Sequence, residues 1–419
     1  MNALRQTIEQ EICERGPIPF SRYMELCLYH PELGYYSRHA AQFGKAGDFY
    51  TSSDVHAVFG RLMARQFAEM WHVLACPERI TAQELGPGRG LFAQDVLDWS
   101  EKKFPDFFRA LRYVLVESSP ALRNRMESTL DRHLASGKAE VGSSAFRDAS
   151  AADSPSPAAQ RRQNAAHGAG RGLKAHNEQA PRGRKILPSL DARTPEAPTI
   201  LFANEFFDAL PVEIVSSQGS LRVGFRDDRF VESWVPASAE ELEFLDRYSI
   251  HPEPGERVEV ALTAQQYGRQ VSREIQQGFF IVIDYGYTRA EQLAGRHRGT
   301  LKTIRQHSVS MNPYEAPGEQ DITADVNFTA LAAAAEEQGM HVHKLITQSQ
   351  FLMGIGEANQ FADAFEDCRL PQERAKVALQ LKHLVTPAGM GESFHVMVAS
   401  KGVDLQKVAA LTGLNFGRR

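Results

Sequence analysis

The spacing of apolar residues predicts helices at the start of the chain. Leu4, Ile8 and Ile12 recur at helical spacing, and a second short helix is expected to end before Pro31. A third and longer pattern begins at Val58 with a broad apolar stripe. A stripe this broad is typical of a helix that packs against a large apolar surface.

Short apolar runs follow at positions where strands are expected. They are residues 79–85, 113–118, 139–144, 199–204 and 278–286. Near-continuous apolar runs separated by helical patterns indicate a parallel sheet that is buried on both faces. Two later runs, residues 341–351 and 394–402, alternate more and could add edge strands, one of them antiparallel. The pattern therefore predicts an α/β fold with a Rossmann-like sheet.

Two segments interrupt the predicted sheet. Residues 147–193 are rich in Ala, Pro, Gly and Arg and lack a sustained period, a composition typical of disorder. Residues 212–278 carry three short strand patterns followed by two helical stretches, which indicates a folded insertion placed to shape a substrate site. We therefore divide the chain into an N-terminal helical cap, residues 1–78, and a sheet domain, residues 79–419, that contains both insertions.

Composition narrows the class of protein. The 419 residues are 42% hydrophobic and 24% charged, and no apolar run is long enough to span a membrane. The net charge of −5 gives no reason to expect a nucleic-acid partner. The four cysteines lie far apart without paired spacing, so we expect neither disulfides nor a metal site. With no export signal at the start, the expected location is the cytoplasm.

The stretch ELGPGRG, residues 84–90, joins the first predicted strand to a helix. Gly86, Gly88 and Gly90 alternate in it, and such spacing indicates a tight turn or a backbone that a ligand approaches closely. Dinucleotide sites use G-x-G-x-x-G, whereas this turn reads G-x-G-x-G after Glu84, with Pro87 between the first two glycines. It matches the first motif of Rossmann-like S-adenosylmethionine-dependent methyltransferases.

A carboxylate stands where a ribose-binding acid is expected. Glu117 ends the second predicted strand, about 27 residues after Gly90, where it can accept both ribose hydroxyls. The helix that starts near Leu91 directs its positive end toward a ligand carboxylate. A glycine-rich turn with an incidental glutamate is the alternative, and the order strand, turn, helix, strand favours the cofactor site.

A second group of polar residues follows the fourth predicted strand in ANEFFDALP, residues 203–211. Asn204, Glu205 and Asp208 fall at the carboxyl end of that strand, where open α/β sheets bind their ligands. Asp284 follows the fifth strand at the same edge. The alternative interpretation is a helix N-terminus at which acids complement the dipole.

Several stretches together resemble the MidA family, the bacterial relatives of the mitochondrial complex I assembly-factor protein arginine methyltransferases. The stretches are HPELGYY, GDFYTSSDVHAVFG, ELGPGRG, VLVESSPALR, ANEFFDALPVE, IDYGY, GTLKTIRQHSVSMNPYEAPGEQDITADVNF and FLMGIG. The resemblance implies a seven-stranded methyltransferase sheet with an N-terminal helical cap. It implies S-adenosylmethionine as cofactor, with Gly47 and Asp48 near it, and symmetric dimethylation of an arginine in a subunit of a respiratory NADH dehydrogenase.

The candidate catalytic residues follow from the chemistry of arginine. A guanidinium group stays protonated and is best held by carboxylates, so Glu205 and Asp208, with Asn204 beside them, are the candidates for the acceptor site. Two other functions stay open: a cofactor-binding assembly chaperone without catalysis, and a dinucleotide-dependent oxidoreductase, which the glycine spacing disfavours. The sequence also leaves the oligomeric state open, a homodimer included.

We expect residues 147–193 to be dispensable, because a segment with little apolar surface to bury contributes little to a core. A chain in which a short Gly/Ser linker replaces them should keep its cofactor affinity, measured by calorimetry, and its melting temperature within about 2 °C. Limited proteolysis of the full chain should cut first inside this segment. A marked loss of affinity in the deletion variant would instead make the segment a structured part of the site.

Overall fold

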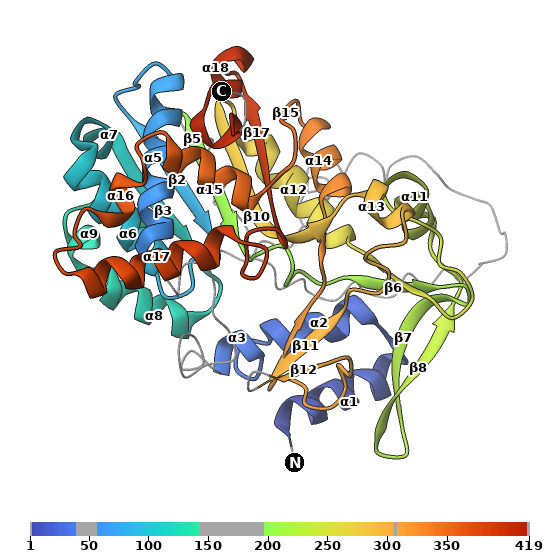
Figure 1. Cartoon of the computed structure of the whole chain (residues 1–419). Helices are drawn as coiled ribbons and strands as arrows, with labels where there is room; N and C mark the ends of the chain where they lie inside the picture. The colour runs from blue at the N-terminus through green and yellow to red at the C-terminus, as the bar shows by residue number, and fades with distance from the viewer. Residues whose placement is uncertain (1, 39–56, 143–196, 306–307, 417–419) are drawn as a thin grey trace, which may run out of the picture.

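The computed structural model describes residues 2–38, 57–142, 197–305 and 308–416. The predicted insertion at residues 147–193 lies outside these ranges. A large sheet covered by helices forms the upper part of the molecule in Figure 1, and the N-terminal helices and two smaller sheets lie below and to its right.

The main sheet has nine strands within the described residues. Along its principal path the order is β15 (His341–Val342), β17 (Phe394–Lys401), β10 (Gly278–Tyr287), β5 (Thr199–Asn204), β2 (Ile80–Leu85), β3 (Leu111–Val116) and β4 (Ala139–Val141), with β14 (Val326–Asn327) beside β10 and β16 (Ile346–Thr347) beside β17. Strands β10, β5, β2, β3 and β4 are parallel, and β17 is antiparallel to β10. The predicted Rossmann-like α/β fold is confirmed, and each of the five apolar runs overlaps a strand of this sheet.

Alternate residues of β10 pack into two apolar cores on opposite faces of the sheet. Phe279 and Ile281 face a core with the helices α5 (Ala57–Val73), α6 (Leu91–Lys103), α7 (Pro105–Ala110), α8 (Pro120–Thr129), α15 (Gln348–Glu357), α16 (Ala362–Phe365), α17 (Pro371–Val385) and α18 (Leu405–Ala409). Phe280 and Val282 face a second core with α12 (Leu262–Glu274) and α14 (Phe328–Glu336). Residues 278–283 of this strand are all apolar because both of its faces are buried.

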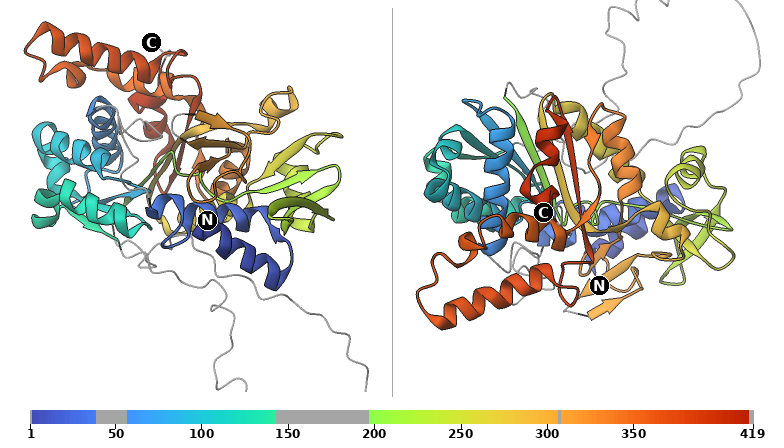
Figure 2. Two further views of the ribbon diagram at one scale, coloured as in Figure 1. Left: turned by 90° about the horizontal axis from the view of Figure 1, so that it is seen from below. Right: turned by 45° about the horizontal axis from the view of Figure 1, so that its top comes forward.

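A second, antiparallel sheet carries the N-terminal helices. Its strands lie in the order β1 (Ile18–Pro19), β7 (Gly219–Arg226), β6 (Glu213–Ser216) and β9 (Arg257–Val260), and β8 (Arg229–Val235) pairs with β7. Helix α11 (Ala239–Tyr248) follows β8 in the chain. The predicted three-strand meander is confirmed as β6, β7 and β8. Helices α1 (Ala3–Arg15) and α2 (Phe20–Tyr29) pack on this sheet through Leu4, Ile8 and Tyr23, against Leu221 and Val223. Figure 2, left, shows both helices from below.

A third sheet lies next to these helices. Its strands are β12 (Ser308–Ser310), β11 (Lys302–Arg305) and β13 (Asp321–Thr323). The remaining short helices are α3 (Tyr35–Arg38), α9 (Asp131–Ala135), α13 (Arg289–Leu293) and a 3₁₀ turn at Thr412–Leu414. Through α3 and β13, the lower part of the molecule reaches the edge at which β2, β3 and β5 end.

The domain limits at residues 1–78, 79–419 and 212–278 stay a prediction, and the packing bears on them in two places. Helix α5 belongs to the predicted cap by sequence, yet it packs on α6 in the core of the main sheet, which provides the large apolar surface its stripe required. Helix α12 belongs to the predicted insertion, yet it packs on α14 and the opposite face of the main sheet.

Candidate functional site

The glycine turn after β2 is held in a left-handed backbone conformation. Gly86, Gly88 and Gly90 have φ values of 63°, 55° and 76°. A Cβ atom on Gly86 would lie 2.9 Å from the ring of Phe206, whereas one on Gly88 would meet no atom within 4 Å. Gly90 faces Met126 of α8. Gly88 is therefore the position where the turn leaves open space for a ligand.

Two buried glutamates stand at the ends of the neighbouring strands. Glu117, just after β3, accepts hydrogen bonds from the N–H groups of Gly88 at 3.2 Å and Ser119 at 2.8 Å. Glu84, in β2, accepts a hydrogen bond from the Tyr113 hydroxyl at 2.9 Å. Burial raises the pKa of Glu117 to about 7 and that of Glu84 to about 8. Both carboxyls are thus poised to ionise when a cationic ligand enters.

Most of the site residues predicted from the sequence line one pocket. Its walls include Glu84, Gly86, Pro87, Gly88 and Glu117 from the cofactor motif and Asn204, Glu205 and Asp208 from the acceptor motif. It encloses about 1140 Å³ of space that no protein atom fills, its mouth included. Gly90 is not among the wall residues, and Gly47 and Asp48 lie outside the described residues. The structure brings the two motifs together, and the role of each residue stays a prediction.

Asp284, at the end of β10, organises the acceptor side of the pocket. One of its carboxylate oxygens accepts hydrogen bonds from the N–H groups of residues 206–208, at 3.2, 3.0 and 3.3 Å. The turn places Glu205 at φ 50°, a conformation that a non-glycine residue adopts only when its surroundings impose it. Glu205 then accepts hydrogen bonds from the Asn204 amide at 3.1 Å and from the Tyr285 hydroxyl at 3.4 Å.

Asp208 is a strongly perturbed acid of the acceptor motif. Its side chain is 5% exposed, and Oδ1 has no hydrogen-bond partner among the described residues. Burial raises the pKa of Asp208 well above its usual value, and the neighbouring Asp284, Asp321 and Glu205 raise it further. Several carboxyls gathered in one buried site create a strong preference for a cationic ligand.

Tyr29, Tyr36 and Asp321 also line this pocket and were not predicted from the sequence. Tyr29 and Tyr36 come from α2 and α3, and Asp321 comes from β13. The Tyr36 hydroxyl donates a hydrogen bond to Asp321 Oδ1 at 3.0 Å. Tyr36 lies in HPELGYY and Asp321 lies in the long stretch that ends in QDITADVNF, two of the stretches that carry the family resemblance. This resemblance is the sequence signal that could have identified them as site residues.

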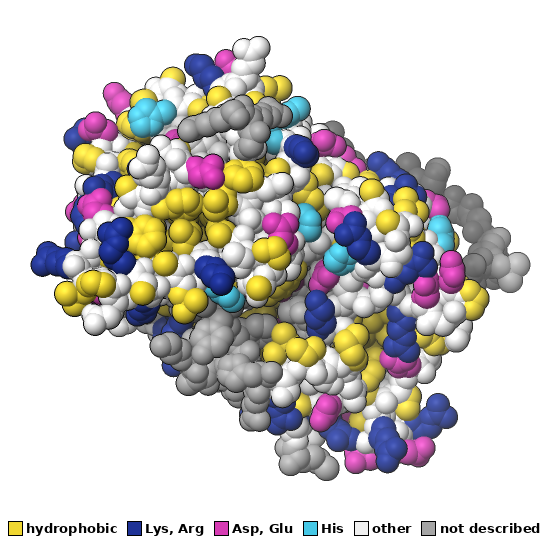
Figure 3. All heavy atoms as spheres, viewed as in Figure 1, with side chains coloured by type: hydrophobic (Ala, Val, Ile, Leu, Met, Phe, Trp, Pro, Cys, Tyr) yellow, Lys and Arg dark blue, Asp and Glu magenta, His cyan; other side chains and the backbone are white. Residues whose placement is uncertain are grey.

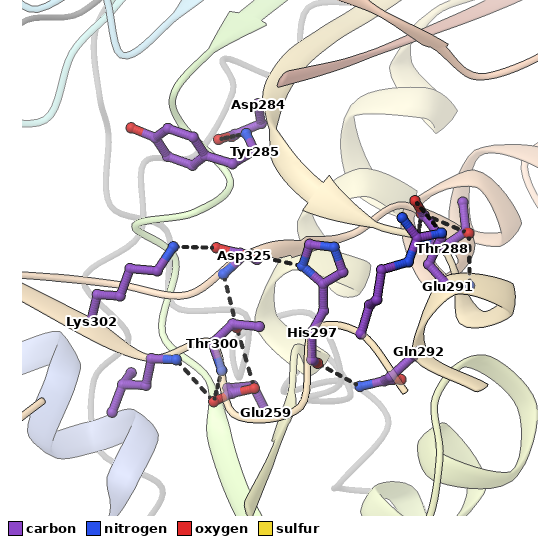
Figure 4. Close-up of polar contacts among 12 residues, drawn as sticks. Glu259, Asp284, Tyr285, Thr288, Glu291, Gln292, His297, Thr300, Lys302 and Asp325 are labelled. Carbon is purple, nitrogen blue, oxygen red and sulfur yellow. Dashed lines mark hydrogen bonds and ion pairs between the residues drawn. The ribbon is translucent and has the colours of Figure 1, made fainter. Parts of the chain in front are cut away.

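A polar network beside the pocket holds Asp325, which follows β13 (Figure 4). Asp325 lies between Lys302 Nζ at 3.0 Å and His297 Nδ1 at 3.1 Å. Glu259, in β9, accepts hydrogen bonds from the N–H groups of residues 300–301 at 2.9 and 3.0 Å. Lys302 is partly exposed and paired with Asp325. The network therefore joins β9 and β11 to the residues just after β13.

The fold and the site together define a class of protein. A strand, a turn of alternating glycines and a helix lead to a buried carboxylate after the next strand, and an acidic pocket lies at the carboxyl ends of the same strands. This arrangement is that of a Rossmann-like S-adenosylmethionine-dependent methyltransferase. Among the described residues, no group of three or more His, Cys, Asp or Glu side chains is arranged to hold a metal ion.

The comparison with protein families gives the particular family. Residues 62–346 match the family described as "Putative S-adenosyl-L-methionine-dependent methyltransferase". This match covers more than half of the chain, and the chain belongs to that family. S-adenosylmethionine is accordingly its cofactor, and a dinucleotide-dependent oxidoreductase is not supported.

Named relatives and solved structures cover nearly the whole chain. The protein arginine methyltransferase NDUFAF7 homolog, mitochondrial, of Drosophila melanogaster is 28% identical over 96% of this chain and 85% of its own. The human mitochondrial NDUFAF7 is 26% identical over 92% and 80%. A methyltransferase-like protein from Burkholderia thailandensis, crystallised with S-adenosyl-homocysteine, has a TM-score of 0.75 at 27% identity and covers 96% of this chain and 92% of its own.

We predict that Gly88→Val abolishes cofactor binding while the fold persists, because the added side chain would occupy the open space beside Glu117. Gly137→Val is the matched control. Gly137 also has a positive φ and would also meet no atom within 4 Å, but it lies outside the pocket. Calorimetry with S-adenosylhomocysteine should show binding in the control alone. Undiminished affinity in a folded Gly88→Val protein would overturn the assignment of the turn.

We predict that cofactor affinity falls as the pH drops below about 7, because a protonated Glu117 can no longer accept hydrogen bonds with both oxygens. The dissociation constant of S-adenosylhomocysteine should rise by up to about tenfold per pH unit between pH 7 and 5.5. Glu117→Gln should bind more weakly and with a flatter profile. Glu259→Gln removes a buried acid outside the pocket and should keep the wild-type profile. An affinity independent of pH in the wild type would remove Glu117 from the binding step.

Proposed function

We propose that this protein transfers a methyl group from S-adenosylmethionine to the guanidinium group of a protein arginine. The observation that carries the proposal is the buried Asp208, whose Oδ1 has no partner among the described residues and which lines the same pocket as Glu117 and the glycine turn. A buried carboxylate oxygen without a partner is costly unless a ligand completes it. A planar cation with several N–H donors is the ligand that fits.

The residues at the two ends of the pocket would have different roles, one end binding the cofactor and the other binding the acceptor. The glycine turn, Glu84 and Glu117 would hold the cofactor, which supplies an activated methyl group when bound. Glu205 and Asp208 would hold the guanidinium through charge-assisted hydrogen bonds and turn one nitrogen toward the cofactor end, with Asn204 fixing the Glu205 carboxylate.

The acceptor nitrogen loses a proton when it is methylated, and an acid of the pocket would accept it. Burial and the neighbouring acids raise the pKa of Asp208, so its carboxylate is a stronger base than an exposed aspartate. The entry of a guanidinium favours the ionised form, because an opposite charge nearby lowers a carboxyl pKa. Asp208 is therefore suited first to bind the cation and then to accept its proton.

The acceptor that we propose is an arginine in a subunit of a respiratory NADH dehydrogenase, methylated symmetrically. The support is the family resemblance of the sequence and the names of the relatives, which are protein arginine methyltransferases. A protein acceptor is also compatible with the surface, because on the face in Figure 3 Lys and Arg are mixed with Asp and Glu and do not form the single basic patch typical of nucleic-acid binding.

The location and assembly of the protein are part of the proposal. The described residues contain no helix long and apolar enough to cross a membrane. We propose a cytoplasmic location, which the four free cysteines favour, although the named relatives are mitochondrial. A homodimer stays an expectation, to be tested by light scattering.

We also propose that residues 212–278 shape the acceptor end through α2. Val212 and Ile214 pack in the same core as α2, and Tyr29 at the end of α2 donates a hydrogen bond to the Ala209 carbonyl at 2.9 Å. The insertion thus supports a pocket wall without providing the candidate catalytic groups.

We predict that Glu205→Gln and Asp208→Asn keep cofactor affinity and lose methyl transfer. Each charge-assisted contact contributes roughly 1.5 to 3 kcal/mol, or about ten- to a hundredfold in rate when it is felt fully in the transition state. The measurement is radiolabelled methyl incorporation into purified NADH dehydrogenase, with mass spectrometry of the acceptor arginine. Asp246→Asn, a change at an exposed acid outside the pocket, should leave the rate unchanged.

The same variants separate an enzyme from an assembly chaperone. Cells that carry Glu205→Gln or Asp208→Asn should fail to assemble the dehydrogenase if methylation is the function. Full assembly together with absent incorporation would favour the chaperone. Full incorporation by both variants would remove these acids from the mechanism.

A further inference from the structure

We infer that Asp321 is a third carboxylate of the acceptor site and that Tyr36 is a positioning residue that connects it to the cofactor side of the pocket. The inference rests on the proposed function and extends it to two residues from parts of the chain 285 positions apart. It also predicts that the two ends of the pocket are energetically coupled.

The position of Asp321 gives the first argument. Asp321 lines the pocket together with Glu205 and Asp208, is 4% exposed, and acts electrostatically on Asp208. Its Oδ1 accepts hydrogen bonds from the Tyr36 hydroxyl at 3.0 Å and from the N–H of Ile322 at 2.9 Å. A buried acid next to two other acids raises the free energy of the empty site, and a cationic ligand offsets that cost.

Tyr36 gives the second argument, because it contacts residues at both the cofactor end and the acceptor end of the pocket. Its hydroxyl bonds to Asp321, and its carbonyl accepts a hydrogen bond from the Ser119 hydroxyl at 2.8 Å. Ser119 in turn donates its N–H to Glu117 at 2.8 Å and caps the start of α8. A continuous chain of hydrogen bonds therefore runs from Glu117 through Ser119 and Tyr36 to Asp321.

The anchoring of β13 gives the third argument. The N–H of Ala324, just after β13, donates to the Asp208 carbonyl at 2.9 Å. Asp325 is held by Lys302 and His297 (Figure 4). The strand that carries Asp321 is thus fixed to the backbone of the acceptor motif, so the distance between the Asp208 and Asp321 carboxyls is set by the fold. Rigid placement is what a site needs to orient a planar guanidinium.

Occupation of the cofactor end should consequently strengthen binding at the acceptor end. A ligand that orders Glu117 and Ser119 also orders the Tyr36 backbone, and an ordered Tyr36 holds Asp321 in the geometry that binds the cation. The second ligand then loses less conformational freedom, which is positive coupling between two sites.

The experiment uses the full chain and two small probes. N-acetylarginine methylamide is the cationic probe, and N-acetylcitrulline methylamide is its neutral isostere. Calorimetry gives the affinity of each probe with and without saturating S-adenosylhomocysteine, and the affinity of S-adenosylhomocysteine alone. The wild type should prefer the arginine probe, and saturation of the cofactor end should increase that affinity.

Two variants test the two residues separately. Asp321→Asn keeps an oxygen that can accept from Tyr36 but removes the charge, so it should weaken the arginine probe by about tenfold and reduce the preference over citrulline. Tyr36→Phe keeps the ring and removes the hydroxyl, so it should reduce the coupling more than it reduces the affinity of S-adenosylhomocysteine. In methyl transfer, both variants should raise KM for the acceptor more than they lower kcat.

The matched control is Tyr314→Phe, which also deletes a hydroxyl that donates to a carboxylate, Glu232 at 3.0 Å, but outside the pocket. It should change neither probe affinity nor coupling. An unchanged melting temperature and retained binding of S-adenosylhomocysteine show that each variant folds.

The outcomes distinguish this inference from the proposed function. If Glu205→Gln weakens the arginine probe and Asp321→Asn does not, the inference is wrong and the proposed function stands. If Tyr36→Phe keeps full coupling, Tyr36 is not the connection. If the wild type binds both probes equally, the guanidinium site itself is wrong, and the inference is overturned with it.

Discussion

The hydrogen bonds around Asp284 are the constraint on which the acceptor site depends. The parallel register of β5 and β10 sets Asn204 opposite Ile283, so the turn after β5 passes directly over Asp284. Three consecutive N–H groups, from residues 206–208, then converge on one oxygen of that fully buried carboxylate. These bonds compensate the left-handed backbone of Glu205 and direct Asp208 into the pocket. A substitution at Asp284 would therefore disturb both acceptor acids at once.

The concentration of acids in the pocket lowers the stability of the protein without its ligands. Burial raises the pKa of Glu84 to about 8 and of Glu117 to about 7, from an ordinary value of 4.5. Between pH 4.5 and those values, the folded protein retains protons that the unfolded chain has lost. Raising the pH through this window consequently lowers the free energy of unfolding. Ligands that complete the site offset this cost, as expected when a site is built for binding rather than for stability.

The sequence predicts the parts of the structure that depend on local patterns. The glycine turn and Glu117 are set by one strand, one helix and the next strand, and the apolar residues 278–283 of β10 follow from burial on both faces. The short strand β9 was not predicted, because four residues between two helices carry too little periodicity. Tyr36 and Asp321 have no local signature for their roles, since only the packing of α3 and β13 brings them together.

The two ends of the pocket therefore differ in how they are built. The cofactor end comes from one stretch, β2 to β3, so its geometry follows from neighbouring elements. The acceptor end requires α3, the turn after β5 and β13, whose contacts span most of the chain and must all form before the acids face one another. Local contacts form with little loss of chain entropy and distant ones with more. Cofactor binding therefore requires only the main sheet to be folded. Binding of the acceptor requires α3, the turn after β5 and β13 to be folded and packed together as well.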